Sequence, residues 1–183
     1  MLIVAFDTCY GVCSAAIGLA EGRNLRRLAG RHERMASGHA ERLPVMLQEI
    51  AAEASVSLAR IDRVAVTRGP GSFTGIRVGV AAARGLILAT GAEIVAATSL
   101  AVIGAAIEPT LPSGRGLLVA MPGPRDLLAV ELLGRSPVPA RLVDLDGLQR
   151  LIRGQDIALA GAAAAAAASH LKAMGSDVAV VSE

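Results

Sequence analysis

The stretch from residue 68 to residue 79, RGPGSFTGIRVG, holds residue types that could bind an anion. Its glycines permit the tight turn and close backbone approach of a strand-to-helix corner. Ser72 or Thr74 can cap the helix that follows, whose first N–H groups and positive dipole end suit a phosphate. The glycine spacing matches neither a Walker A loop nor G-x-G-x-x-G. A structural corner and an anion site are therefore both open interpretations.

The other reactive side chains form no recognisable catalytic pattern. Leu43 stands four residues after His39, so a His-x3-His pair on one helical face cannot form there. Neither Ser72 nor Ser99 lies in a G-x-S-x-G elbow, and Cys9 has no adjacent basic group to lower its pKa. We therefore expect no metal site and no catalytic nucleophile.

Composition limits the classes of partner. The 183 residues carry a net charge of +2, and alanine makes up much of the 53% hydrophobic content. A nucleic-acid binder that stacks bases needs several exposed aromatic rings. The aromatic residues here stand only at positions 6, 10 and 73. Neither charge nor aromatic content therefore indicates a base-reading protein.

The compartment is expected to be cytoplasmic, without membrane contact. Asp7 interrupts the first apolar run, which argues against a secretory signal. The apolar segment 76–90 contains Arg77 and Arg84 and is expected to be too short to span a bilayer. Cys9 and Cys13 have a C-x3-C spacing that fits neither a redox pair nor a zinc pair, so we expect buried thiols.

Periodicity and turn residues predict two subdomains, 1–108 and 109–183, separated where proline and glycine become frequent. The first should contain strands at 2–6, 12–19, 25–31, 61–67 and 93–97, with helices at 40–53, 74–90 and 99–107. The second should contain strands at 117–121, 127–133 and 156–160, an alanine-rich helix at 161–174 and a last strand within 176–183. This order indicates a mixed sheet with packed helices.

Three motifs resemble the TsaB (YeaZ) family of tRNA threonylcarbamoyladenosine biosynthesis proteins. They are the block at 68–79, the opening LIVAFDT at 2–8 and GHAERLP at 38–44. The resemblance covers residues 1–105. Later the family's Asp-Ala-Arg-x-x-Glu-Val-Tyr segment is replaced by MPGPRDLLAVE at 121–131. The resemblance implies an α/β protein of the actin-like (ASKHA, ribonuclease H-like) fold.

The resemblance also implies a function. It points to a non-catalytic subunit that binds and supports TsaD, together with TsaE, in forming N6-threonylcarbamoyladenosine at position 37 of tRNAs reading ANN codons. Asp7 and Thr8 would be a degenerate nucleotide turn, with no cofactor on this chain and with ATP and metal on TsaD and TsaE. The chain would form a homodimer in isolation and meet tRNA only through the complex. The alternative is a small-molecule kinase or ATPase that uses Asp7, Thr8 and the 68–79 loop. A peptidase, the family's older label, lacks a triad here.

Two sets of residues follow from the resemblance. The signature loop comprises Arg68, Gly69, Pro70, Gly71, Ser72, Phe73, Thr74, Gly75 and Arg77. The helices at 40–54 and 74–90 would form the partner surface, although their apolar residues are equally compatible with core packing. The residues expected at that surface are Val45, Met46, Ile50, Gly75, Gly79, Val80 and Ala83.

A basic cluster lies between residues 23 and 34, where five arginines and one glutamate give a net charge of +4. Such a cluster is typical of the solvated face of an edge strand, where charge also prevents aggregation. The alternative is a secondary contact with RNA phosphates.

Overall fold

The computed structural model describes residues 1–134, 136–176 and 178–181. The chain forms two compact units, Met1–Ser99 and Leu100–Glu183. The division lies nine residues before the predicted one at 108/109. Its physical reason is α3 (Ser99–Ile107), whose Leu100 and Ile107 pack against strands of the second unit.

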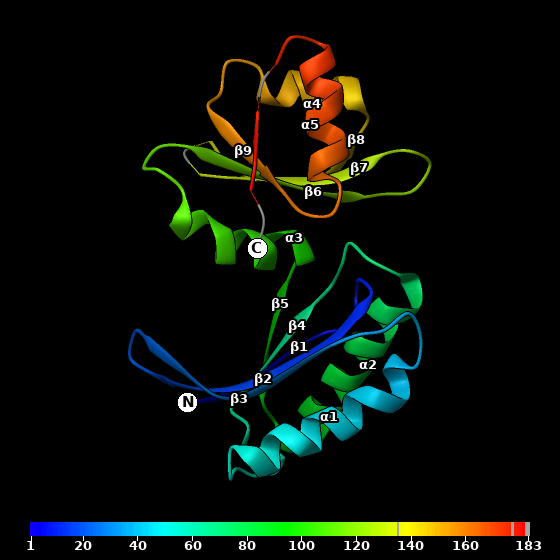
Figure 1. Ribbon diagram of the computed structural model, residues 1–183. Coiled ribbons are helices and arrows are strands. Elements are labelled where there is room, and N and C mark those ends of the chain that lie inside the picture. Colours follow the sequence, from blue (N-terminus) through cyan, green and yellow to red (C-terminus); the bar gives the residue numbers. More distant parts are fainter. Residues whose placement is uncertain (135, 177, 182–183) are drawn as a thin grey trace. The chain divides into compact units, whose positions relative to one another are not determined.

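The first unit is a mixed sheet with two helices on one face (Figure 1). Its strands lie in the order β3-β2-β1-β4-β5. β1, β2 and β3 form an antiparallel meander, whereas β4 and β5 run parallel to β1. The strands are β1 (Leu2–Asp7), β2 (Val12–Glu21), β3 (Asn24–Arg34), β4 (Arg63–Thr67) and β5 (Glu93–Ala97). The helices are α1 (His39–Glu53) and α2 (Phe73–Thr90), with a 3-10 turn at Leu58–Arg60. The predicted order of these elements is confirmed.

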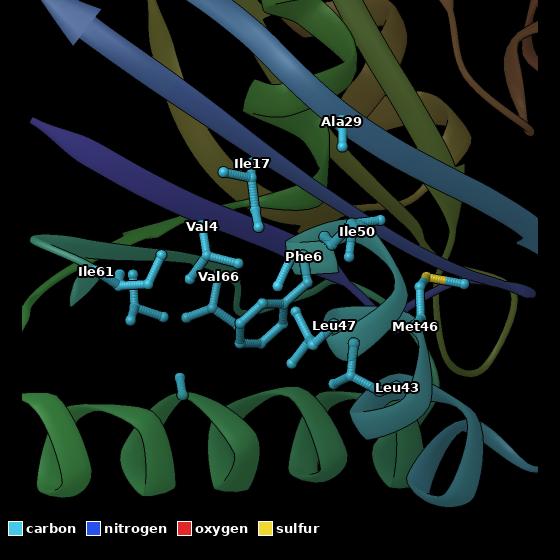
Figure 2. Packing of buried hydrophobic residues seen from close by; sticks show 14 of the residues in the cluster. Val4, Phe6, Ile17, Ala29, Leu43, Met46, Leu47, Ile50, Ile61 and Val66 are labelled. Carbon is cyan, nitrogen blue, oxygen red and sulfur yellow. The ribbon is translucent and has the colours of Figure 1, made fainter. Parts of the chain in front are cut away.

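The core of the first unit lies between the sheet and the helices (Figure 2). Val4 and Phe6 alternate along β1 toward the helices, as expected of a sheet with one buried face. From α1, residues at helical spacing meet them: Leu43, Met46, Leu47 and Ile50. Ala83 is the fully buried contribution of α2, so α2 approaches the sheet closely through small side chains.

The ends of α2 follow from its capping residues. The Ser72 side chain accepts a hydrogen bond from the backbone N–H of Gly75, and Gly91 ends the helix in the left-handed conformation with φ 72°. α1 begins at His39, so Pro44 lies inside the helix rather than in its first turn. Proline has no N–H to donate, and the carbonyl of Ala40 therefore lacks its intrahelical partner.

α2 has 18 residues and is apolar enough to cross a membrane by length and composition, which corrects the expectation that this segment is too short. The helix starts at Phe73, three residues before the predicted apolar segment. It is the single helix of this kind in the described part of the chain. Of its residues, 17% are buried, and α2 packs on β4 and β5 through its buried side.

The second unit is also a five-stranded mixed sheet, in the order β10-β9-β6-β7-β8. Alternate residues of β6 pack on opposite faces: Leu117 and Val119 toward α3, and Leu118 and Ala120 toward α4 and α5. The strands are β6 (Gly116–Pro122), β7 (Leu128–Leu133), β8 (Val138–Val143), β9 (Ile157–Ala160) and β10 (Ala179–Val180). The helices are α4 (Leu145–Ile152), α5 (Ala164–Ala173) and the 3-10 turn Glu108–Thr110.

Three details of the second unit differ from the prediction. β8 and α4 were not predicted. α5 begins at Ala164 rather than at residue 161, because Gly161 has φ 93° and forms the turn before it. The predicted last strand is β10, while positions 177, 182 and 183 lie outside the described residues.

The segment at 121–131 keeps its place in the second sheet despite its divergence from the family pattern. Gly123 donates a backbone hydrogen bond to Leu127, and Leu127 donates one to Pro124. Arg125 and Asp126 both have positive φ, as a two-residue hairpin turn requires. The segment therefore forms the β6–β7 hairpin.

Candidate functional site

The signature loop packs against the turn that contains Asp7 and Thr8, so the two predicted sites form one structure. The backbone N–H of Ser72 donates to the carbonyl of Cys9 at 2.6 Å. The Thr8 hydroxyl donates to the carbonyl of Gly75 at 2.7 Å, and this contact is buried. We call these residues, Asp7–Cys9 and Arg68–Gly75, the glycine corner.

The glycines are required by close backbone approach. A Cβ atom at Gly75 would lie 2.0 Å from the carbonyl oxygen of Thr8, and one at Gly71 would lie 2.2 Å from that of Cys9. At Gly79 the Thr8 hydroxyl oxygen would be 2.9 Å away. These distances favour the interpretation of the motif as a structural corner.

The Asp7 carboxylate holds the turn through one oxygen. Its Oδ1 accepts from the backbone N–H of Cys9 and from the Thr67 hydroxyl, each at 2.7 Å. The Cys9 thiol lies 3.2 Å from the same Thr67 hydroxyl. Burial is the main cause that raises the pKa of Cys9, so its thiol stays protonated, and Cys13 is buried too, as predicted.

The exposed part of the corner is the start of α2. Ser72 occupies the N–H of Gly75, which removes one of the donors that an anion would use. Phe73 is 73% exposed, and the Arg77 guanidinium lies 5.1 Å from the centre of its ring. Such stacking orders a cation on the surface of the helix.

Three residues predicted at the partner surface, namely Met46, Ile50 and Ala83, are instead core residues. Met46 and Ile50 are fully buried, because they lie on the face of α1 that packs on the sheet. Gly75, Gly79 and Ala83 are also buried, within the first unit. Val45, at 48% exposure, and half-buried Val80 are the members of the set that solvent reaches.

A groove of about 490 Å³ lies between α1 and α2. Apart from Thr74 and Arg77 at one end of α2, its lining is apolar. The lining residues are Ala40, Leu43 and Pro44 from α1 and Thr74, Arg77, Val78, Ala81 and Ala82 from α2. We call this the α1–α2 groove. The sequence prediction missed Ala40, Pro44 and Ala81. Ala40 and Pro44 on α1 are four residues apart, as are Arg77 and Ala81 on α2, and this spacing could have indicated a shared face on each helix.

The outer side of α2 continues this apolar surface. Leu88 is 88% exposed, and Ala81, Gly85 and Ala89 are exposed on the same helix. Charge on α2 comes from Arg77 and Arg84, with no acidic residue. The helix thus presents small and apolar side chains together with positive charge.

His39 is buried at the start of α1, and its Nε2 has no hydrogen-bond partner in the described part of the chain. Over the same residues, no group of three or more His, Cys, Asp and Glu side chains could hold a metal ion. The predicted basic cluster lies on β3, an edge strand of the first sheet, as expected.

Comparison with known proteins agrees with this geometry. A protein-family model described as "TsaD: tRNA N6-adenosine threonylcarbamoyltransferase" matches residues 32–126. The Escherichia coli tRNA threonylcarbamoyladenosine biosynthesis protein TsaB is 38% identical over 94 residues, which cover 51% of this chain and 38% of TsaB. This chain therefore spans little more than a third of that relative's length.

Solved structures agree on the fold. YeaZ from Pseudomonas aeruginosa has a TM-score of 0.63 at 29% identity, over 78% of this chain and 63% of YeaZ. An uncharacterised protein with similarity to peptidase YeaZ from Pseudomonas aeruginosa gives 0.77 at 23% identity, over 100% of this chain and 84% of that one.

The two sheets with their helices define an α/β protein of the actin-like fold. The family model covers more than half of the chain. The chain therefore belongs to the TsaD/TsaB (YeaZ) family of tRNA threonylcarbamoyladenosine biosynthesis proteins.

Proposed function

We propose that the chain is a non-catalytic subunit that binds and supports TsaD in forming N6-threonylcarbamoyladenosine at position 37 of tRNAs reading ANN codons. The α1–α2 groove is the observation that carries this proposal. A groove between two helices with an apolar lining suits a helix of a partner, as in helix-in-groove recognition.

The energetic case rests on the exposed side chains around the groove. Val45 and Leu88 are both largely exposed, although isolated apolar side chains are common on surfaces. Val45 is turned away from Ala40 and Leu43 on α1, so the apolar area comes from the groove lining and from exposed Leu88 on α2. Such an area in a monomer marks an interaction site. Burying it would supply binding energy, and Arg77 would add specificity if the partner offers a carboxylate.

The glycine corner supports a structural rather than a catalytic role. One oxygen of Asp7 and the hydroxyl of Thr8 are both used in internal hydrogen bonds. We expect ATP and metal to bind to TsaD and TsaE rather than to this chain. When TsaD is absent, the same groove would be covered by a second copy of the chain.

Ala81→Glu tests the proposal at an exposed position in the groove lining. The added carboxylate is solvated in the free chain but becomes buried in a complex, where an unpaired charge is costly. We expect an unchanged circular dichroism spectrum and at least tenfold weaker binding to TsaD in a titration.

Ala52→Glu is the matched control, because it makes the same substitution at an exposed alanine of α1 that lies outside the groove lining. It should bind TsaD as the parent does. If Ala81→Glu folds and binds TsaD normally, the groove is not the partner surface.

A further inference from the structure

Arginines are concentrated on one hairpin of the first unit. Residues 23–34 form β3 and part of the turn that joins it to β2. Their net charge of +4 exceeds the +2 of the whole chain, so the rest of the chain is net negative.

The charges on the helix side of β3 are neutralised within the fold. Arg31 and Glu33 lie opposite buried residues of β2 and therefore face α1. Arg31 forms an ion pair with Glu53 at 2.6 Å. Glu33 accepts from Arg42 at 2.7 Å.

Arginines without ion-pair partners among the described residues lie on the other face of the hairpin at Arg27 and Arg34, in its turn at Arg23, and opposite Leu19 at Arg26. Arg34 lies opposite Val12 and His32 opposite Ser14, so their side chains leave the sheet away from the helices. Beyond the irregularity in this ladder, the stem of Arg27 lies over Gly30, where an added Cβ would be 3.6 Å from the Arg27 Cδ. In the described part of the chain, no ion pair engages the exposed arginines Arg23, Arg26, Arg27 and Arg34.

The hairpin lies at an edge of the first sheet. β3 is the sheet edge opposite β5, the strand through which the chain leaves this unit. Figure 1 shows the turn of the hairpin projecting away from α1 and α2. The unpaired arginines therefore lie outside the α1–α2 groove.

We propose that the β2–β3 hairpin binds the phosphate backbone of structured RNA through Arg23, Arg26, Arg27 and Arg34. Guanidinium groups form bidentate hydrogen bonds to phosphate oxygens and remain charged at every physiological pH. The choice of RNA over other polyanions rests on the proposed function in tRNA modification. The inference goes beyond that function, because it gives this chain its own contact with the RNA.

The contact is with the backbone rather than with the bases. Residues 12–34 include no Phe, Tyr or Trp, and His32 is the single ring on which a base could stack, whereas a base-stacking surface needs several. A row of arginines along a strand positions an RNA without reading its sequence. The hairpin should thus bind unrelated folded RNAs with similar affinity.

Salt dependence gives the expected magnitude. If each of the four arginines neutralises one phosphate, the logarithm of the association constant falls with the logarithm of salt concentration with a slope of about −3. Affinity should then fall roughly 50- to 150-fold between about 50 and 200 mM salt.

The experiment measures binding of an unmodified tRNA transcript to the full chain, by fluorescence anisotropy over that salt range. The hairpin variant replaces Arg23, Arg26, Arg27 and Arg34 by glutamine. A charge-matched control replaces four exposed arginines elsewhere, namely Arg60, Arg125, Arg141 and Arg153. We expect the hairpin variant to lose at least tenfold in affinity and most of the salt slope. The control should change less than threefold.

Three results would overturn the proposal: equal losses in both variants, no salt slope in the parent, or tighter binding to vesicles containing phosphatidylserine than to tRNA. Titration with TsaD separates this proposal from the proposed function. The hairpin variant should bind TsaD normally, whereas Ala81→Glu should bind tRNA normally in the absence of TsaD. Each proposal can therefore fail without the other.

Discussion

The glycine corner and the α1–α2 groove lie at the same end of α2. They differ in how far their groups are engaged in contacts within the first unit. The corner carries the family signature, and its hydroxyl, carboxylate and backbone groups are largely engaged internally. The groove is lined partly by residues of the 38–44 and 68–79 motifs, but Ala40, Pro44 and Ala81 in its lining are exposed. The same motifs can therefore meet a packing requirement through their glycines and also contribute side chains to a surface available for binding.

The largest effect should come from filling the corner. In Gly75→Val, the new Cβ would lie 2.0 Å from the Thr8 carbonyl oxygen. This is a backbone atom, so a change of side-chain rotamer cannot relieve the clash. We expect a loss of more than about 4 kcal/mol in the free energy of unfolding, as for severe overpacking. Urea denaturation followed by circular dichroism measures it.

Gly71→Val should behave in the same way, because its Cβ would lie 2.2 Å from the Cys9 carbonyl oxygen. A variant that melts like the parent but no longer supports tRNA modification would show that the corner is a functional loop. The contrast between corner and groove would then be wrong.

The next effect concerns Asp7. Asp7→Ala removes the acceptor for the Cys9 N–H and for the Thr67 hydroxyl, both of which belong to buried residues. Leaving such groups unsatisfied costs about 1–3 kcal/mol each. Because the Thr67 hydroxyl keeps the Cys9 thiol as a partner, we expect a combined loss in the lower part of the summed range, about 2–4 kcal/mol. Asp7→Asn keeps an acceptor oxygen and should lose less than half of this in the same urea denaturation.

The same residue tests the kinase alternative. We expect calorimetry to detect no micromolar binding of Mg-ATP to the isolated chain. Micromolar binding that Asp7→Ala abolishes would make the corner a nucleotide site. It would also favour an enzyme over a supporting subunit.

A smaller effect of opposite sign is expected at Gly85. An added Cβ at this exposed helical position would meet no atom within 4 Å. Gly85→Ala should therefore stabilise the chain by about 0.5–1 kcal/mol, because alanine restricts the unfolded chain and favours the helix. The melting temperatures of Gly85→Ala and Gly71→Val compare a glycine in open space with one that is packed against the backbone of Cys9.

Much of the first unit could be predicted from sequence, because its strands alternate and its helices carry an apolar stripe at helical spacing. Met46 and Ile50 were assigned to the partner surface, but they lie with Leu43 and Leu47 on the face of α1 that is buried against the sheet. β8 was missed because Pro139 and Arg141 obscure its alternation. α4 was missed because Gly147 lies in its first turn, where the Asp144 side chain caps it.

Hydrophobic contrast in the sequence does not reveal the groove, and only the four-residue spacing of its lining residues indicates their shared face. Alanines at 40, 81 and 82 give no hydrophobic contrast, so periodicity does not mark the face that they occupy. The carbonyl of Ala40 lacks its intrahelical partner because Pro44 lies inside α1. Predicting this requires the exact residue at which the helix starts. Contact between Thr8 and the signature loop is likewise tertiary, since the Thr8 hydroxyl bonds to Gly75, which is 67 positions away.

The smallest expected effect lies on the outer side of α1, where Arg42 joins Glu33 to Glu49. Hydrogen bonds from Arg42 hold the pKa of both carboxyl groups below their ordinary value of 4.5. The stabilisation is thus fully present above that value and is lost as the pH falls through the lowered pKa values. All three groups are solvated, so the change in melting temperature should be small. Arg42→Gln should flatten the decline of the melting temperature below about pH 4.5, whereas Arg60→Gln should leave it unchanged. Parallel curves for Arg42→Gln and the parent between about pH 6 and 3 would show that this network adds nothing to the stability of the helix that borders the groove.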